Sequence, residues 1–193
     1  MMISLVQQQH CMRCPALVAS RRRIVHGYGD VRSGIVFIGE APGRHGADQT
    51  GIPFSGDRSG RILRRILVRL GLASDETATA SLRCFITNTV RCCPPGNRTP
   101  TAAEVQSCRE WLDTELDLIK PRLLIPVGRI ALQEVGKRYL ENAPGAIRAL
   151  HATVLRGREV TILPMMHPAR ISRVDAEAFI AAMQPLVDRR NEP

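Results

Sequence analysis

Four short runs of apolar residues have the length and spacing of strands that are buried on both faces. They span residues 34–39, 84–87, 123–127 and 160–163, and the second run leads directly into Asn88. Strands that face solvent on one side alternate between apolar and polar residues, whereas short unbroken apolar runs are typical of interior strands. The pattern therefore predicts four strands in the middle of a sheet.

Helical periodicity appears between these runs. Over residues 57–70 the apolar residues recur every third or fourth position, and the arginines of this stretch are expected on the opposite face. Thr101 and Glu104 have the spacing of a capping box at the start of a second helix. The inward face of that second helix would carry Val105, Cys108, Trp111, Leu112, Leu116 and Ile119.

Two further segments, residues 130–135 and 176–187, also have a helical pattern, whereas the Gly/Pro-rich residues 94–100 are expected to form no regular structure. Strands that alternate with helices predict an α/β fold, a three-layer α/β/α sandwich with a central, mainly parallel four-stranded sheet. Ligands of such sheets bind beyond the carboxyl ends of the strands. The loops that follow the strands are therefore expected to converge, and they begin at Gly39, Asn88, Gly128 and Met165.

The length and charge of the chain narrow the class of protein. With 193 residues, the chain is expected to form one domain over residues 1–193 and to need no disulfides. Lys and Arg outnumber Asp and Glu by 27 to 18, which gives a net charge of +9. Such a surplus favours a polyanionic partner such as nucleic acid, although a merely basic enzyme would have the same composition.

No segment of the sequence predicts export or membrane insertion. Residues 1–10 lack a basic leader with a long apolar stretch, and no run approaches the roughly 20 apolar residues that span a bilayer. We therefore expect a cytoplasmic protein with no membrane partner. Thiols stay reduced in that compartment, so its six cysteines are interpreted as metal ligands or packed side chains.

Four cysteines form the pattern of a metal centre. Cys11 and Cys14 are two residues apart, and Cys92 and Cys108 lie in the middle of the chain. Four thiolates suit a tetrahedral zinc ion and an iron–sulfur cluster equally, and the spacing leaves both open. Either group would tie the N-terminal segment to the middle of the chain. The neighbouring Cys93 could replace Cys92 as a ligand.

Several polar and aromatic residues occur where a ligand would bind. The Gly/Pro-rich residues 39–43 follow the first predicted strand, Asn88 ends the second, and His167 follows the fourth. Phe54 lies on a loop between glycines, where it could stack on a ligand or fill the core. Each feature is common in isolation, since Gly/Pro turns often follow strands.

Together these segments resemble the uracil-DNA glycosylase superfamily, and most closely its iron–sulfur branch, often called family 4. The resemblance covers residues 11–173 in the family's order. The matching pieces are residues 39–43, 51–54, 87–88, Arg91, Cys92, residues 94–98, Cys108 and residues 167–169.

The resemblance implies a monofunctional DNA glycosylase that flips uracil out of DNA and hydrolyses its N-glycosidic bond, leaving an abasic site. It implies Asn88 and His167 as catalytic residues. Glu40 is interpreted as the third, because it is the only carboxylate of residues 39–43 and could position the attacking water. The substrate pocket would be formed by Ala41, Gly43, Phe54 and Asn88.

The same resemblance implies how the cysteines and the basic residues are used. It implies a [4Fe–4S] cluster on Cys11, Cys14, Cys92 and Cys108, with zinc as the alternative. It also implies that the loop after His167 enters the minor groove of DNA, with Ile171 as a wedge and Arg170 and Arg173 on phosphates. Further candidates for phosphate contacts are Arg58, Arg91 and Arg98, and we expect a monomer to bind the DNA.

The loop after the Gly/Pro turn departs from the family pattern. Residues 44–48 carry one acidic residue, Asp48, where the family commonly has more, and His45 could take over as base or contact phosphate. The same fold and chemistry could therefore act on another base, such as a deaminated purine or a phage-type modified cytosine, and an enzyme of the latter kind would serve anti-phage defence. A further reading is a non-catalytic module that binds lesions or single-stranded DNA.

Overall fold

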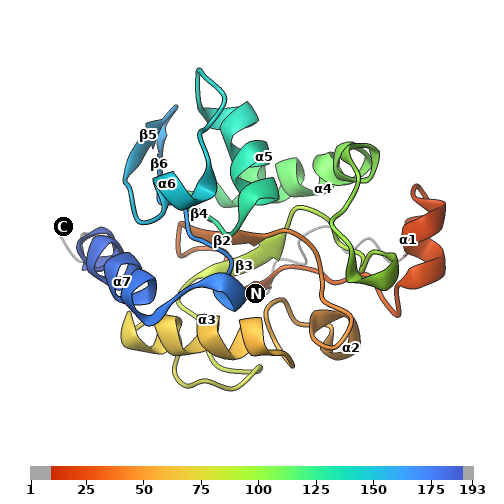
Figure 1. Cartoon of the computed structure of the whole chain (residues 1–193), viewed down its shortest axis with the longest axis horizontal. Helices are drawn as coiled ribbons and strands as arrows, with labels where there is room; N and C mark the ends of the chain where they lie inside the picture. The colour runs from red at the N-terminus through yellow and green to blue at the C-terminus, as the bar shows by residue number, and fades with distance from the viewer. Residues whose placement is uncertain (1–9, 189–193) are drawn as a thin grey trace.

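The computed structural model describes residues 10–188, so residues 1–9 of the N-terminal segment and residues 189–193 lie outside the described part. Its centre is a six-stranded sheet in the order β1-β3-β2-β4-β6-β5 (Figure 1). The four predicted runs form β2 (Ile35–Gly39), β3 (Phe85–Asn88), β4 (Leu123–Pro126) and β6 (Val160–Ile162). These four strands are parallel, as predicted.

The expectation of a four-stranded sheet was wrong at the two edges. β1 (Tyr28–Gly29) pairs antiparallel with β3, and β5 (Leu155–Gly157) pairs antiparallel with β6. These strands are two and three residues long and partly exposed, so they contain no apolar run that a sequence pattern could reveal.

Helices cover both faces of the sheet, which confirms the three-layer α/β/α arrangement (Figure 1). α3 (Arg58–Arg69) and α7 (Arg173–Asp188) lie on one face, and α4 (Ala102–Ile119) and α5 (Arg129–Tyr139) lie on the other. Successive residues of β2 supply both layers. Phe37 packs in the cluster that contains residues of α3 and α7, whereas Ile38 packs with residues of α4 and α5.

The predicted helix starts are present in the structure. Asp57 caps α3, because its Oδ1 accepts a hydrogen bond from the Gly60 N–H at 2.8 Å. Thr101 and Glu104 form the reciprocal capping box at the start of α4. One arginine of α3 departs from the expected solvent-facing set. Arg64 is 1% exposed, and its guanidinium lies 6.0 Å from the centre of the Tyr28 ring.

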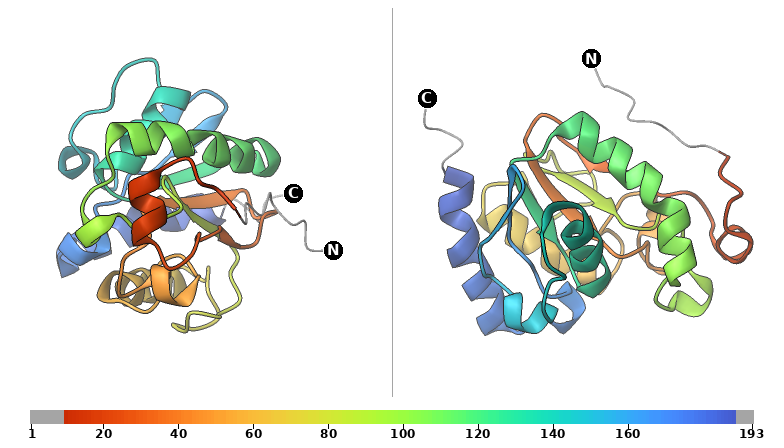
Figure 2. Two further views of the ribbon diagram at one scale, coloured as in Figure 1. Left: turned by 90° about the vertical axis from the view of Figure 1, so that its right-hand side faces the viewer. Right: turned by 90° about the horizontal axis from the view of Figure 1, so that it is seen from above.

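Short helical elements connect these layers. They are α1 (Pro15–Ser20), α2 (Ala47–Thr50), α6 (Ile147–Leu150) and the 3₁₀ turns η1 (Pro95–Asn97) and η2 (Pro168–Arg170). The segment at residues 94–100 thus contains one 3₁₀ turn, which was not predicted, and Figure 2 shows it beside α1. Among residues 10–188, no helix combines the length and apolar character needed to cross a membrane.

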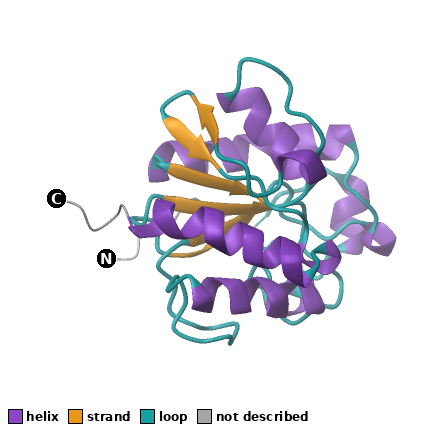
Figure 3. Cartoon of the chain, turned by 60° about the vertical axis from the view of Figure 1, so that its left-hand side comes forward, coloured by secondary structure: helices purple, strands orange, loops and turns teal. Residues whose placement is uncertain are grey.

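The four parallel strands all point in one direction, and the loops that follow them gather at their carboxyl ends (Figure 3). Gly39 and Asn88 are register partners at the ends of β2 and β3. The Gly128 N–H donates to the Met165 carbonyl at 2.8 Å, which joins the loops after β4 and β6. The predicted convergence of the four loops is therefore present.

Candidate active site

Gly39 is the point at which the predicted pocket residues meet. A Cβ at this position would lie 2.4 Å from Asn88 Oδ1 and 2.7 Å from Phe54 Cε2. Only glycine lets both side chains lie directly against the end of β2. Asn88 is 3% exposed, and its amide makes no hydrogen bond to the described part of the protein. The amide is therefore available to a ligand at this edge of the sheet.

Phe54 is held in a conformation that its residue type rarely adopts. Its φ of +49° lies in the left-handed region, and a Cβ at Gly60 would come within 2.6 Å of the Phe54 carbonyl. The first turn of α3 thus packs directly on the Phe54 backbone. The Phe54 ring centre lies 6.3 Å from that of His167. Strained residues of this kind concentrate at functional sites.

His167 has a defined tautomer. Its Nδ1 accepts a hydrogen bond from the Ala169 N–H at 3.3 Å, so the neutral ring carries its proton on Nε2. Burial lowers the pKa of His167, and the nearby Arg170 acts in the same direction, while Asp57 opposes them. A neutral imidazole with a free Nε2–H is therefore the form to expect at neutral pH.

Glu40 directly follows β2 and is half-buried. Burial raises its pKa, and the opposing influences are a hydrogen bond with Thr99 and the positive charges of Arg129 and Arg170. Its carbonyl accepts a hydrogen bond from the Val90 N–H at 3.0 Å, which ties this residue to the chain after β3.

The structure adds a second carboxylate, from Asp57, that the sequence interpretation used only as part of a helix. A Cβ at Gly43 or Gly46 would lie 3.0 Å or 2.7 Å from Asp57 Oδ2. The carboxylate thus lies under the Gly/Pro-rich loop and close enough to influence His167. The sequence around Asp57 has the pattern of a helix start and gave no signal that its carboxylate lies beside this loop. Asp48, in contrast, is 2% exposed and accepts a hydrogen bond from the Arg22 N–H.

All four predicted metal ligands line one small cavity of about 20 Å³. The lining includes Cys11, Cys14, Cys92 and Cys108. Arg21 reaches this cavity, since its Nη1 donates to Cys92 Sγ at 3.2 Å and its Nη2 donates to the Cys11 carbonyl at 2.8 Å. The set of four thiols with a cation beside them fits a negatively charged thiolate-bound group.

The remaining cysteines have other surroundings. Cys93 is fully buried but absent from the cavity lining, and its thiol donates to the Pro94 carbonyl at 3.6 Å. Cys84 lies in the core beneath α3. Ala41 packs against the cluster that contains Cys92 and Cys108, so the loop after β2 contacts the cysteine layer directly.

The basic residues predicted to contact DNA differ in their placement. Arg58, Arg170 and Arg173 are exposed, and Ile171 is half-buried against the core. Arg98 is exposed as a residue, but its guanidinium makes two hydrogen bonds to Glu104, at 2.7 and 2.8 Å.

Arg91 is a correction to the predicted DNA surface. It is 5% exposed, and its Nη2 lies 2.7 Å from Glu115 Oε2. The same carboxylate accepts a hydrogen bond from the Thr87 hydroxyl at 2.8 Å, next to Asn88 in β3. A basic residue in a family motif cannot be assigned to solvent or core by its type alone. Arg91 therefore braces β3 from inside and lies buried beneath the surface on which it was predicted.

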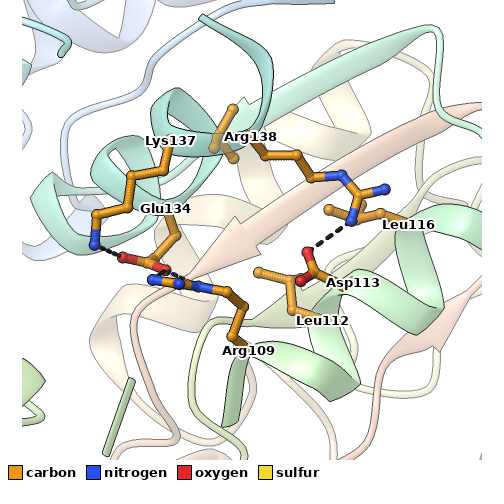
Figure 4. Close-up of a pocket in the computed structure, with 8 residues that line it drawn as sticks. Arg109, Leu112, Asp113, Leu116, Glu134, Lys137 and Arg138 are labelled. Atoms are coloured by element: carbon orange, nitrogen blue, oxygen red, sulfur yellow. Dashed lines mark hydrogen bonds and ion pairs between the residues drawn. The ribbon is translucent and has the colours of Figure 1, made fainter. Parts of the chain in front are cut away.

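A larger cavity, of about 240 Å³, lies away from these residues, between α4 and α5 (Figure 4). Its lining includes the apolar Leu112 and Leu116, with ion pairs around them. Glu134 accepts from Arg109 at 2.7 Å, and Asp113 pairs with Arg138 at 2.6 Å. Because these ion pairs join α4 to α5, this cavity is a seam between helices and has no part in the group around Gly39.

Comparison with known proteins agrees with this arrangement. A sequence profile of the uracil DNA glycosylase superfamily matches residues 26–188. A type-5 uracil-DNA glycosylase from Pyrobaculum aerophilum is 32% identical over 184 residues, which cover 84% of this chain and 80% of the relative. A type-4 enzyme from the same organism is 34% identical over 171 residues, which cover 87% and 82%.

A further relative, a type-5 uracil-DNA glycosylase from Thermus thermophilus, is 37% identical over 145 residues, which cover 64% of this chain and 66% of the relative. The matched profile spans the sheet, its covering helices and the residues gathered around Gly39. This chain belongs to the uracil-DNA glycosylase superfamily.

Proposed function

We propose that this protein is a monofunctional DNA glycosylase that flips uracil out of DNA and hydrolyses its N-glycosidic bond, leaving an abasic site. The observation that carries the proposal is the meeting of Asn88 and Phe54 over Gly39, with His167 beside Phe54. This group combines a stacking ring, an amide and a neutral imidazole donor at the edge of the sheet where ligands of α/β folds bind.

Asn88 is proposed to recognise the base. Its amide can donate to O4 of uracil and accept from N3–H, whereas cytosine presents the reverse pattern. Each mispaired polar group in a dry pocket costs on the order of 1–3 kcal/mol, which supports rejection of cytosine. Phe54 would stack on the flipped base, and backbone groups of Ala41 and Gly43 would complete the pocket.

His167 is proposed to stabilise the departing base. Negative charge develops on O2 of uracil as the bond breaks, and the Nε2–H that its tautomer leaves free would donate to this oxygen. A Schiff-base step, which needs a lysine beside the sugar, is not proposed. The chain has two lysines, and both lie away from the group around Gly39. Lys120 follows the end of α4, before β4 begins, and Lys137 lines the cavity between α4 and α5.

Water activation is assigned to Glu40, and Asp57 is the competing carboxylate. We expect Glu40→Gln to lower the single-turnover rate about 100-fold, the lower end of general-base contributions. Asp57→Asn should change it less than about tenfold, because Asn is an equally good helix cap and preserves the fold. Single-turnover cleavage of uracil-containing DNA measures both. The reverse order of effects would assign water positioning to Asp57.

We propose that Cys11, Cys14, Cys92 and Cys108 hold a [4Fe–4S] cluster that fixes the N-terminal segment to the start of α4. Four cysteine thiols line one cavity, and the Arg21 guanidinium donates to Cys92 Sγ, which supports a thiolate-bound group of negative charge at this place. Zinc is the alternative, because four thiolates also suit a tetrahedral zinc ion.

The DNA-binding surface is proposed to combine four exposed arginines with the half-buried Ile171 of the loop that follows His167. It consists of Arg58, Arg98, Arg170, Ile171 and Arg173. Ile171 would fill the space of the flipped base, and the arginines would contact phosphates. We propose further that residues 1–193 act as one domain and as a monomer in the cytoplasm. The six cysteines, which all lie within residues 10–188, form no disulfides, and thiols stay reduced in that compartment.

The proposed activity is tested with end-labelled oligonucleotides that carry one uracil, followed by alkali to reveal abasic sites. Matched oligonucleotides with hypoxanthine, xanthine or a modified cytosine, single- and double-stranded, are run in parallel. Cleavage at uracil supports the proposal. Cleavage only at another base would mean that residues 44–47 have changed the specificity of the pocket. Binding without cleavage of any base would favour the non-catalytic module.

A further inference from the structure

A second histidine, His151, connects the segment that carries His167 to the first turn of α7. Its Nδ1 accepts a hydrogen bond from the Met166 N–H at 3.1 Å, and its Nε2 lies 2.9 Å from the Asp175 carbonyl oxygen. Since Nδ1 is the acceptor, the neutral ring carries its proton on Nε2 and donates it to that carbonyl. Both ring nitrogens are therefore used, one on each side of the loop 167–172.

The orientation of the His151 ring is fixed by its surroundings. The ring stacks on Phe179 at 6.0 Å between centres and 12° between planes, and Phe179 is fully buried in α7. The next residue along the chain, Ala152, donates its N–H to the Pro164 carbonyl at 3.0 Å. The ring is thus held between the strand that leads to His167 and the helix that follows it.

The other end of the loop is held by the residue that His151 contacts. The Asp175 carboxylate accepts hydrogen bonds from the Ser172 N–H at 3.1 Å and from the Ser172 hydroxyl at 2.7 Å. Met166 is thus fixed by the His151 ring, and Ser172 is fixed by Asp175, whose carbonyl is bound to the same ring. His167 and Ile171 lie between these two fixed points.

We propose that His151 is a positioning residue: its hydrogen bond with the Met166 N–H sets the place of His167, and its contact with the Asp175 carbonyl orients the ring for that bond. It does not touch the base. The inference rests on the proposed function, because the consequence of misplacing His167 is measured as lost cleavage. A displacement of about 1 Å at a reacting group can cost on the order of 100-fold in rate.

Two substitutions separate the hydrogen bonds from the packing. His151→Phe keeps an aromatic ring against Phe179 and removes both hydrogen bonds. His151→Asn retains a carbonyl oxygen near the position of Nδ1, so the Met166 N–H keeps its acceptor. We expect His151→Phe to lower the single-turnover cleavage rate about 10- to 100-fold, and His151→Asn to stay within about threefold of the unchanged protein.

The same substitution in a His167→Ala background shows whether His151 acts through His167. If it does, His151→Phe should change the residual rate less than about twofold in that background, because coupled residues are not additive. An equal loss in both backgrounds, a wild-type rate for folded His151→Phe, or a rate for His151→Asn as low as that of His151→Phe would overturn the proposal.

Hydrogen exchange provides a measurement that does not depend on activity. The Met166 amide of the unchanged protein should exchange slowly, and its protection should fall in His151→Phe and be retained in His151→Asn. Fast exchange of the Met166 amide in the unchanged protein would overturn the inference. This measurement needs no variant, so it remains decisive even if His151→Phe does not fold. If the Met166 amide is protected in this way but the protein cleaves no uracil, the proposed function is contradicted. The positioning of Met166 by His151 would still be supported.

Discussion

His167→Ala should lower the rate of uracil excision about 100- to 1,000-fold, the cost of removing one donor to a developing anion. The structure gives the reason: His167 Nδ1 accepts a hydrogen bond from the Ala169 N–H, so Nε2–H is the one N–H donor of the neutral ring. The fold should persist, because the ring lies at the rim of the sheet and is only half-buried. Single-turnover cleavage under saturating enzyme measures the loss.

DNA affinity and the thermal midpoint serve as controls for this variant, and both should remain near the values of the unchanged protein. His45→Ala is a matched control, because His45 is exposed on the loop over Asp57 and should retain most of the rate. If His45→Ala abolished cleavage and His167→Ala did not, the roles assigned to the two histidines would be wrong.

Cys108→Ala should abolish binding of the proposed metal group and lower the thermal midpoint by about 8–16 °C. Loss of a buried metal site is among the changes that cost on the order of 4 kcal/mol, and each kcal/mol shifts the midpoint of a chain of this size by about 2–4 °C. Burial raises the pKa of the Cys108 thiol to about 11, so a bound cation is needed to keep it as thiolate at neutral pH.

Elemental analysis for iron and zinc measures this loss and separates the two candidate groups. Trp111 adds a fluorescence signal, because it is the single tryptophan and packs against the hydrophobic side-chain cluster that contains Cys92 and Cys108. Its emission should rise when a quenching iron–sulfur group is lost. Cys93→Ala is the matched control and should retain the metal. Metal loss from Cys93→Ala, with retention in Cys108→Ala, would contradict the ligand assignment.

The sequence was sufficient for the four central strands because burial on both faces leaves unbroken apolar runs. Ile35, Phe37 and their neighbours in β2 contribute alternately to the two layers, so every position had to be apolar. β1 and β5 were missed because short, partly exposed edge strands need no such run.

The placement of a candidate residue was predictable where it ends or follows a central strand, as for Asn88 and His167. It was not predictable where function depends on what lies opposite. Arg91 was expected on DNA and pairs internally with Glu115. Asp57 was interpreted only as part of a helix, whereas its Oδ2 lies under the Gly/Pro-rich loop. His151 had no signal at all, since both of its partners are backbone groups.

The short antiparallel strands at the two ends of the sheet have a consequence for life in a crowded cell. A long exposed edge is a template on which another copy can add a strand and start a fibre. Here each edge offers only two or three residues, β1 at one end and β5 at the other. Copies that meet at high concentration therefore gain little from pairing edge to edge, because so few backbone groups are offered at either side.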